Sequence, residues 1–195
     1  APFGYEDSDI FNRWIIAGYE MVQSRDALVY HMTCRGHKWN KGVGIENPDY
    51  RDIMNRCERE YQRKWGDWIQ NDNYQHPIIN PKYDRGIIIK NCNENLLIQL
   101  EPWADTLYID CEYENYIEKE SKRTVVDLRE KIRPLDNEKQ NAILIEVDGN
   151  TFTQQDYIYI RQLSPILKQN TPAPGEFNLN NLKLNIIRYE EEVHS

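Results

Sequence analysis

The stretch that decides the fold is Ala142-Ile143-Leu144-Ile145-Glu146-Val147, an apolar run interrupted by one charged residue. Such a run, rich in β-branched residues, predicts a buried β-strand. Residues 153–169 follow with apolar side chains at helical spacing, and Thr151 or Thr153 can cap the start of that predicted helix. Residues 182–187 predict a further strand. This order of strand, helix and strand predicts an α/β fold, with α+β as the alternative.

Further strands and a helix are also predicted on the N-terminal side of this stretch. The strands are predicted at residues 86–90, 96–100 and 106–109, and the helix at residues 122–132. Pro165 lies inside the helix predicted over residues 153–169, so we expect it to strain the last turn. Residues 86–195 are therefore predicted to form a small α/β sandwich domain, and no motif within them assigns a function.

The first part of the chain has a different pattern. It predicts a helix at residues 7–22, a strand at residues 27–32 and a helix at residues 48–65. Residues 71–85 are polar and contain two prolines, which predicts a linker. The expected organisation is thus a segment over residues 1–70, a linker over residues 71–85 and a domain over residues 86–195.

Composition disfavours several classes of function. The chain has 195 residues, 39% hydrophobic and 29% charged, so it can bury a core. Its net charge of −8 disfavours binding to nucleic acid or to an anionic membrane surface. No apolar run is long enough to cross a bilayer and no signal peptide is recognisable, which predicts a cytoplasmic protein. The cysteines form no CxxC pair and are expected to remain reduced.

The most informative motif is Phe3-Gly4-Tyr5-Glu6-Asp7-Ser8-Asp9-Ile10-Phe11-Asn12-Arg13. In it, two adjacent carboxylates follow a glycine and open the first predicted helix. The free backbone N–H groups of a helix N-terminus keep a nearby carboxylate ionised and oriented, which a general base requires. Gly4 lets a substrate approach the backbone closely. The pattern therefore favours acid–base chemistry at the start of this helix.

This motif resembles the acidic motif of GT-A fold glycosyltransferases, in the C-terminal portion of that fold. The galactosyltransferase and chondroitin-polymerase-like groups are the most similar. The positions that fit are Glu6, Asp7, Asp9, Ile10, Phe11 and Arg13. The resemblance covers residues 1–66, one third of the chain, and implies that this part is a segment of a GT-A-like α/β domain.

The resemblance implies a role for each acidic residue of the motif. The second acid of the pair, Asp7, is the expected catalytic base that deprotonates the hydroxyl of the acceptor sugar. Glu6 and Asp9 are expected to bind that sugar. Tyr5 replaces the second glycine of the common pattern, and its ring is expected to stack on the acceptor.

The resemblance also implies a metal ligand. In such families a histidine at the end of the next strand binds the divalent cation that bridges the donor diphosphate. His31 ends the predicted strand and follows Glu6 by 31 − 6 = 25 residues, close to the family spacing, so it is the expected ligand of Mn²⁺ or Mg²⁺. His37 is the second candidate. Arg35, Lys38 and Trp39 are expected to close over the diphosphate.

The implied activity is inverting, metal-dependent transfer of a sugar from a nucleotide-sugar donor to a hydroxyl of a glycan acceptor. In the family, the nucleotide-binding half with its Asp-x-Asp motif precedes the acidic motif, and this sequence contains no such half. We therefore expect the chain to be inactive, or nearly so, on its own. Asp110-Cys111-Glu112 and Glu146-Val147-Asp148 imitate Asp-x-Asp, but both follow the acidic motif in chain order.

Other interpretations of these residues remain open. Glu6 and Asp7 are also typical of an ordinary helix start, and His31 of a core or loop histidine. The spacing of His31, Cys34 and His37 permits a structural zinc site, with Cys57 as a fourth ligand. Among the aromatic residues, which are expected mostly in the core, Tyr5, Trp39 and Trp68 are candidates for stacking on a sugar.

A second class of function is a non-catalytic glycan-binding or oligomerisation module. It is favoured by the lack of any chemical motif in residues 86–195. A GT-A segment without its nucleotide-binding half is also expected to expose a sheet edge and an apolar face, which favours a homo-oligomer.

Overall fold

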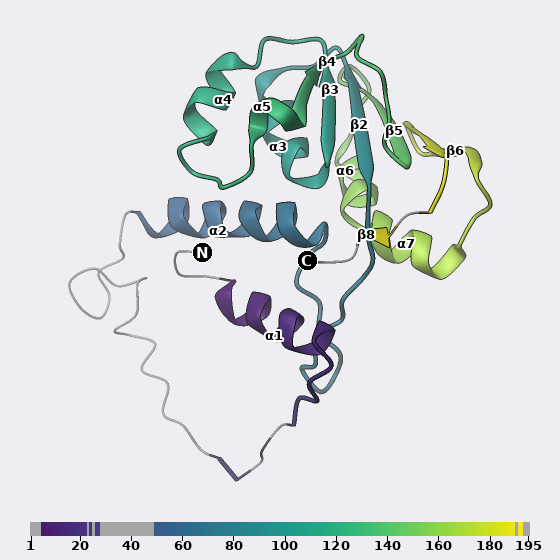
Figure 1. The fold of residues 1–195 in the computed structure, drawn as a ribbon. Helices are drawn as coiled ribbons and strands as arrows, with labels where there is room; N and C mark the ends of the chain where they lie inside the picture. The colour runs from purple at the N-terminus through teal and green to yellow at the C-terminus, as the bar shows by residue number, and fades with distance from the viewer. Residues whose placement is uncertain (1–4, 23, 25, 28–48, 190, 193–195) are drawn as a thin grey trace. The chain divides into compact units, whose positions relative to one another are not determined.

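The chain folds into two compact units in the computed structural model, which describes residues 5–22, 24, 26–27, 49–189 and 191–192. The first unit consists of Ala1–Tyr61 with Ile69–Ile79, and the second of Gln62–Trp68 with Asn80–Ser195 (Figure 1). The protein is of the α/β class, as the sequence predicts. Two strands, β1 (Lys82–Tyr83) and β2 (Arg85–Lys90), begin within the segment predicted as a linker.

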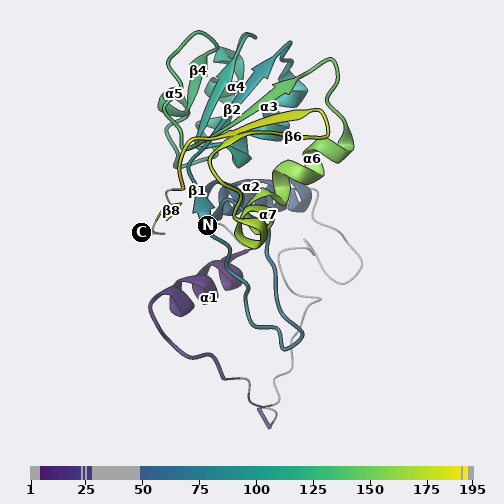
Figure 2. The same ribbon diagram turned by 90° about the vertical axis from the view of Figure 1, so that its right-hand side faces the viewer.

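The second unit is built on a six-stranded mixed sheet in the order β4-β3-β2-β5-β7-β6. The strands that join β2 are β3 (Thr106–Ile109), β4 (Ile132–Pro134), β5 (Ile143–Asp148), β6 (Gly175–Leu179) and β7 (Leu182–Ile186). The first four strands of this order are parallel, and β7 and β6 are antiparallel additions beside β5. Figure 2 shows β6, near the yellow end of the colour scale, at one edge of the sheet. A separate pair joins β1 to β8 (Glu191–Glu192).

One face of the sheet carries the hydrophobic core. Strand register places Ile87, Leu107, Ile145 and Leu184 side by side on this face, and all four are buried. The same core cluster contains apolar residues of every helix that follows β2, whereas Ile88, which faces the other side, is not part of it. These helices are α3 (Glu94–Leu100), the 3-10 helix η2 (Glu101–Trp103), α4 (Glu114–Glu120), α5 (Leu128–Lys131), α6 (Gln154–Arg161) and α7 (Leu163–Asn170). The unit is therefore a two-layer sandwich.

The opposite face is only partly covered, by the eight residues 135–142 that connect β4 to β5. This segment crosses β3 and β2, because β5 pairs with β2 on its far side. Within it, Asn141 accepts a hydrogen bond of 3.0 Å from the Tyr108 hydroxyl. Lys139 places its ammonium 5.4 Å from the centre of the Tyr108 ring. Beyond β5 the outward residues of this face are exposed or half-buried and mostly polar.

The strand predicted at residues 96–100 is wrong, because this segment forms α3. Asn93 caps the helix by accepting a hydrogen bond of 3.0 Å from the Leu96 amide. Leu96, Leu97 and Leu100 are buried while Ile98 is exposed, which is a helical and not a strand pattern. A short apolar run is ambiguous between the two structures, and the cap decides it here.

Two predicted helices also differ from the structure. The helix predicted at 153–169 is divided into α6 and α7 at Gln162, although Thr153 caps its start as expected. Pro165 lies in the first turn of α7, where its missing N–H breaks no helical hydrogen bond, so the predicted strain in a last turn is wrong. The helix predicted at 122–132 is reduced to α5, and α4 was not predicted.

The first unit contains α1 (Glu6–Ile16) and most of α2 (Tyr50–Trp65). Cys57 and Tyr61 lie on the buried face of α2, as their helical spacing predicts. None of the helices that the structure describes has the length and hydropathy that crossing a bilayer requires. The strand predicted at residues 27–32 includes positions 28–32, which lie outside the described residues.

The fully buried carboxylate of Glu101, in η2, binds side chains from three helices, α2, α4 and α5. It pairs with Arg63 from the end of α2, at 2.6 Å, and with Lys131 of α5, at 2.8 Å. It also accepts a hydrogen bond of 2.8 Å from the Tyr116 hydroxyl of α4. Arg63 in turn pairs with Glu120 at 2.6 Å. Burial lowers the pKa of Lys131, while hydrogen bonds to Glu101 outweigh burial and raise the pKa of Arg63.

A second buried carboxylate, Asp156 of α6, ties the β6–β7 turn to the helix. It accepts hydrogen bonds from Thr153 in a capping box, and from Asn180 and Asn181 in the turn. Burial alone would raise the pKa of Asp156, but the hydrogen bonds from Thr153, Asn181 and Asn180 outweigh it and lower the pKa to about 2. The ionised form is therefore the one that the fold requires.

We expect Glu101→Gln to destabilise the protein by about 3–5 kcal/mol, because it removes the charge that compensates buried Arg63 and Lys131. The measurement is the free energy of unfolding from urea titration. The matched control is Glu118→Gln, which breaks an exposed pair with Lys122 at 3.7 Å and should change stability by less than about 0.5 kcal/mol. Equal stability of the two variants would contradict the role given to Glu101.

We expect Asp156→Asn to cost about 1–3 kcal/mol at neutral pH. Because the folded-state pKa lies below the ordinary value of 3.8, the stabilisation by the carboxylate is complete above 3.8 and is lost as the pH falls toward about 2. The difference in unfolding free energy between the parent and Asp156→Asn should therefore shrink over that range. Asp136→Asn, at an exposed carboxylate, is the control. A difference independent of pH would exclude this linkage.

Candidate functional site

The acidic motif opens α1, as the sequence predicts, and its first residues have a defined backbone geometry. Tyr5 stands at the N-cap in the left-handed conformation, with φ of 69°, and offers no side-chain cap. Its carbonyl accepts the first helical hydrogen bond, from the Asp9 amide at 2.9 Å. Glu6, Asp7 and Asp9 therefore lie in the first turn, where the helix dipole stabilises negative charge.

The helix is shorter than the one predicted at residues 7–22. It ends at Ile16, and Gly18 follows with φ of 82° and donates to the Ile15 carbonyl at 2.9 Å. A left-handed glycine just after the last turn stops a helix, which explains the early end. The apolar side chains of Trp14 and Ile16 near this end are each 44% exposed.

The three acids of the first turn differ in their surroundings. Asp9 pairs with Arg13 at 3.3 Å, one turn along the helix. Glu6 lies close enough to Cys57 for its charge to act on that thiol. Asp7 is exposed, and no hydrogen bond or ion pair engages its carboxylate in the part of the chain that the structure describes. Among these three acids, Asp7 is thus the one whose oxygens no described residue engages.

Tyr5 connects the motif to α2. Its ring lies 5.6 Å from that of Tyr61, centre to centre, and its hydroxyl forms a hydrogen bond with Glu58. Burial, and then the charge of Glu58, raise the pKa of Tyr5 to about 12. About two turns into α1, Asn12 donates a buried hydrogen bond of 2.8 Å to the Tyr61 hydroxyl. Tyr61 therefore anchors both the start and the middle of α1.

The other residues of the predicted site lie outside the described residues. This applies to the metal ligand His31, to its alternative His37, and to the loop residues Arg35, Lys38 and Trp39. The described part of the chain contains no group of three His, Cys, Asp or Glu side chains that could hold a metal ion such as Mn²⁺ or Mg²⁺.

The zinc alternative also involves residues that the structure does not describe. Cys34 lies outside the described residues together with His31 and His37. The fourth proposed ligand, Cys57, is buried on α2. Burial, and then the negative charge of Glu6, raise the pKa of the Cys57 thiol, which does not favour the thiolate that zinc requires.

Of the two sequences that imitate Asp-x-Asp, one follows β3 and the other ends β5, the two parallel strands that flank β2. Their aspartates bind the protein itself. Asp110 accepts hydrogen bonds from the Asn91 and Cys92 amides, at 2.7 and 2.8 Å. Asp148 accepts from the side chain of Asn91 and from the Asn150 amide, each at 2.9 Å. These carboxylates stabilise the turns at the carboxyl ends of β2, β3 and β5.

Trp68 is a less open stacking surface than the sequence suggested. The Arg161 guanidinium lies 4.1 Å from the centre of its ring, and the Trp103 ring lies 6.1 Å away. Trp68 is only partly exposed and packs against the core of the second unit. Packing against these side chains therefore occupies much of the surface of the Trp68 ring.

Sequence reasoning missed a polar groove on the open face of the sheet. The groove has a volume of about 500 Å³ and is lined by β5, β6 and β7. The lining side chains that can hydrogen-bond are Glu146, Glu176, Asn178, Lys183 and Asn185. A signal for it exists in the sequence, because the polar residues of β6 and β7 alternate with residues that face the core.

Comparison with known proteins identifies no relative. No protein-family model matches the sequence. No curated protein matches it, and no solved structure matches it.

We expect Tyr61→Phe to destabilise the first unit by about 1–3 kcal/mol, because the buried amide of Asn12 loses its acceptor. Hydrogen exchange of the α1 amides should accelerate in parallel. Tyr74→Phe is the matched control, since Tyr74 is 70% exposed. Unchanged exchange in α1 after Tyr61→Phe would show that this hydrogen bond does not hold the helix.

Proposed function

We propose that the first unit is the acceptor and base segment of a GT-A-like glycosyltransferase. The proposed reaction transfers a sugar from a nucleotide-sugar donor to a hydroxyl of a glycan, with inversion. The observation that carries this proposal is the acidic motif at the start of α1, in which the Asp7 carboxylate is exposed and unengaged within the described residues. The matching pattern of the flanking residues supports it.

The chemistry of the proposed base follows from its position. Asp7 lies in the first turn of α1 with an exposed side chain, so its carboxylate can accept a proton from an acceptor hydroxyl. As that proton leaves, the hydroxyl oxygen attacks the anomeric carbon of the donor. A single displacement of this kind inverts the configuration at that carbon.

The neighbouring residues hold the base and the acceptor in place. Arg13 pairs with Asp9, and Glu6 and Asp7 precede this pair at the start of the helix. We assign Glu6 to hydrogen bonds with the acceptor hydroxyls. Tyr5 contacts Tyr61 and Glu58, and these contacts fix the residue that directly precedes Glu6 and Asp7. A divalent cation at His31 would offset the charge of the leaving diphosphate.

A second candidate function belongs to the sheet unit, where the open-face groove favours a non-catalytic glycan-binding role. Asn178 and Asn185 offer amide donors and acceptors to sugar hydroxyls, and Glu176 offers a carboxylate. Leu144, which pairs with Asn185 and lies on the same face, adds an apolar surface at the groove. This groove lies wholly within the second unit and does not involve α1.

One experiment distinguishes the two candidates. Saccharides of a panel are titrated into isotope-labelled protein and followed by NMR. If the first proposal holds, signals of α1 shift, and Glu6→Gln weakens binding by about tenfold because a charge-assisted hydrogen bond is lost. The isosteric Asp7→Asn should change saccharide affinity by less than about twofold, since a base acts on the reaction and not on binding. In a parallel titration, His31→Ala should weaken Mn²⁺-dependent binding of a nucleoside diphosphate.

The contrary outcomes are distinct. Shifts confined to β6 and β7, with affinity that Glu6→Gln leaves unchanged, would replace the first candidate by the second. Lys183→Glu should then abolish binding while Glu6→Gln does not. Binding of none of the saccharides at either place would contradict both proposals.

A further inference from the structure

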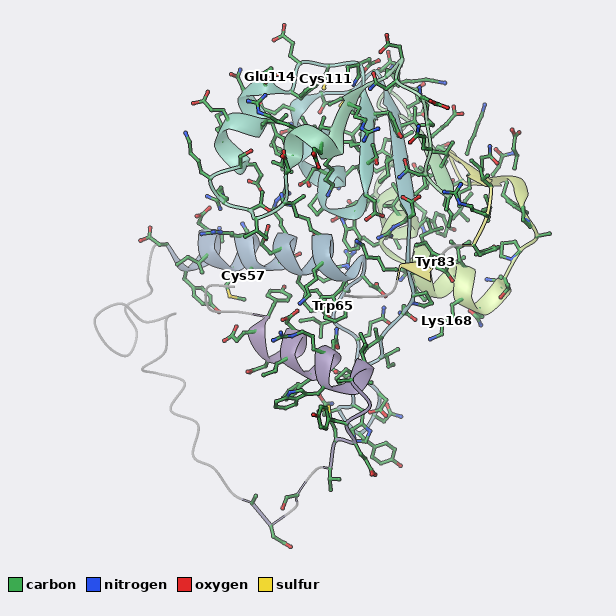
Figure 3. All side chains as sticks on the ribbon, viewed as in Figure 1. Cys57, Trp65, Tyr83, Cys111, Glu114 and Lys168 are labelled. Carbon is green, nitrogen blue, oxygen red and sulfur yellow. The ribbon has the colours of Figure 1, made fainter. Side chains whose placement is uncertain are left out.

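Two cysteines far apart in the sequence follow neighbouring strands of the sheet. Strand β2 ends at Lys90, two residues before Cys92, and β3 ends at Ile109, two residues before Cys111. The two strands are parallel, and Ile89 pairs with Ile109 at their carboxyl ends. Parallel pairing therefore brings both cysteines to the same edge of the sheet. Figure 3 shows Cys111 at this edge, close to Glu114 at the start of α4.

Asp110 holds the two turns together. Its carboxylate accepts hydrogen bonds from the backbone amides of Asn91 and Cys92, at 2.7 and 2.8 Å. The backbone of Cys92 is thus tied to the residue that directly precedes Cys111. Asn93, the residue after Cys92, is fixed as the N-cap of α3, so the turn has little freedom to move away.

The two thiols interact. The side chain of Cys111 lies close enough to that of Cys92 to shift its pKa by hydrogen bonding and by charge. Both residues are partly exposed, unlike Cys57, so a small reagent in solution can reach them. Burial, and then the interaction with Cys111, raise the pKa of Cys92, so this thiol keeps its proton, which it donates to the Asn93 carbonyl at 3.5 Å.

We propose that Cys92 and Cys111 are a redox modification site, at which a small-molecule disulfide converts the two thiols into an intramolecular disulfide. The Cys111 thiolate attacks one sulfur of the oxidant, such as glutathione disulfide, and releases one equivalent of the small thiol. Cys92 then loses its proton and attacks the Cys111 sulfur of the mixed disulfide, which releases the second equivalent. Two protein thiols are oxidised, and one small disulfide is reduced to two thiols.

The bond would link the β2–α3 turn to the β3–α4 turn and close a loop that contains α3 and β3. Asp110 already brings these turns together, so the folded chain is arranged for closure, whereas the unfolded chain is not. Oxidation should therefore raise the melting temperature by several degrees. The sheet edge at β2 and β3 would then be fastened covalently in oxidising conditions and by hydrogen bonds alone in reducing conditions.

The test uses the chain with glutathione disulfide as the oxidant, followed by acid quenching, alkylation and tryptic digestion. No Lys or Arg lies between Lys90 and Lys119, so both cysteines stay on one peptide, residues 91–119. Oxidation should lower the mass of this peptide by about 2 Da and block its alkylation. Further cleavage before Asp105 and Asp110 should give fragments that separate only after reduction.

Two variants make the result specific. In the background Cys34→Ala with Cys57→Ala, the same peptide should still lose about 2 Da, because only Cys92 and Cys111 remain. In Cys92→Ser and Cys111→Ser, the remaining thiol should stop at the mixed disulfide with glutathione and the melting temperature should not rise. Independent glutathionylation of both thiols in the parent chain would overturn the proposal. So would a folded chain that closes the disulfide no faster than the same chain in urea.

Discussion

A carboxylate without access to water is the constraint on which the sheet unit depends. Glu101 is fully buried, and a buried charge is tolerated only when opposite charges and hydrogen-bond donors surround it. Arg63, Lys131 and Tyr116 provide them from α2, α5 and α4, so these helices must be in place together. The end of α2 therefore belongs to the second unit although the rest of that helix does not. The boundary between the units follows this charge cluster.

The fold class could be predicted from the sequence because strands such as β5 combine β-branched residues with clear ends. Features that depend on a single residue could not be predicted, because one residue changes the hydrophobic pattern very little. Asn93 turns an apolar run into α3, and Gly18 stops α1 six residues before the pattern ends at residue 22 (22 − 16 = 6). The strand order could not be predicted at all, because it depends on how residues 135–142 cross β3 and β2, and nothing in their composition specifies that path.

The candidate site could likewise be predicted from the sequence only in part. The sequence identified the acidic residues at the start of α1, because a helix N-terminus has a local signature. It did not indicate that Asp9 pairs with Arg13, that Tyr5 packs on Tyr61, or that Asn12 is buried against the same residue. These contacts join α1 to α2 across some 49 positions of sequence, where periodicity carries no information. The separation of the three acids into engaged and open carboxylates is therefore a property of the folded chain.

The position of β5 has a consequence for the protein while it is being made. Strands β2, β3 and β4 and their helices leave the ribosome before residue 143, but β2 needs β5 as its second neighbour. Until β5 is synthesised, the side of β2 that pairs with β5 has no partner. Ile87, Ile88 and Ile89 then form an unpaired, apolar strand edge in the nascent chain. The short segment 135–142 limits that interval, because the closing strand follows only eight residues behind β4. A longer insertion there would prolong the time in which nascent chains can aggregate through this unpaired edge.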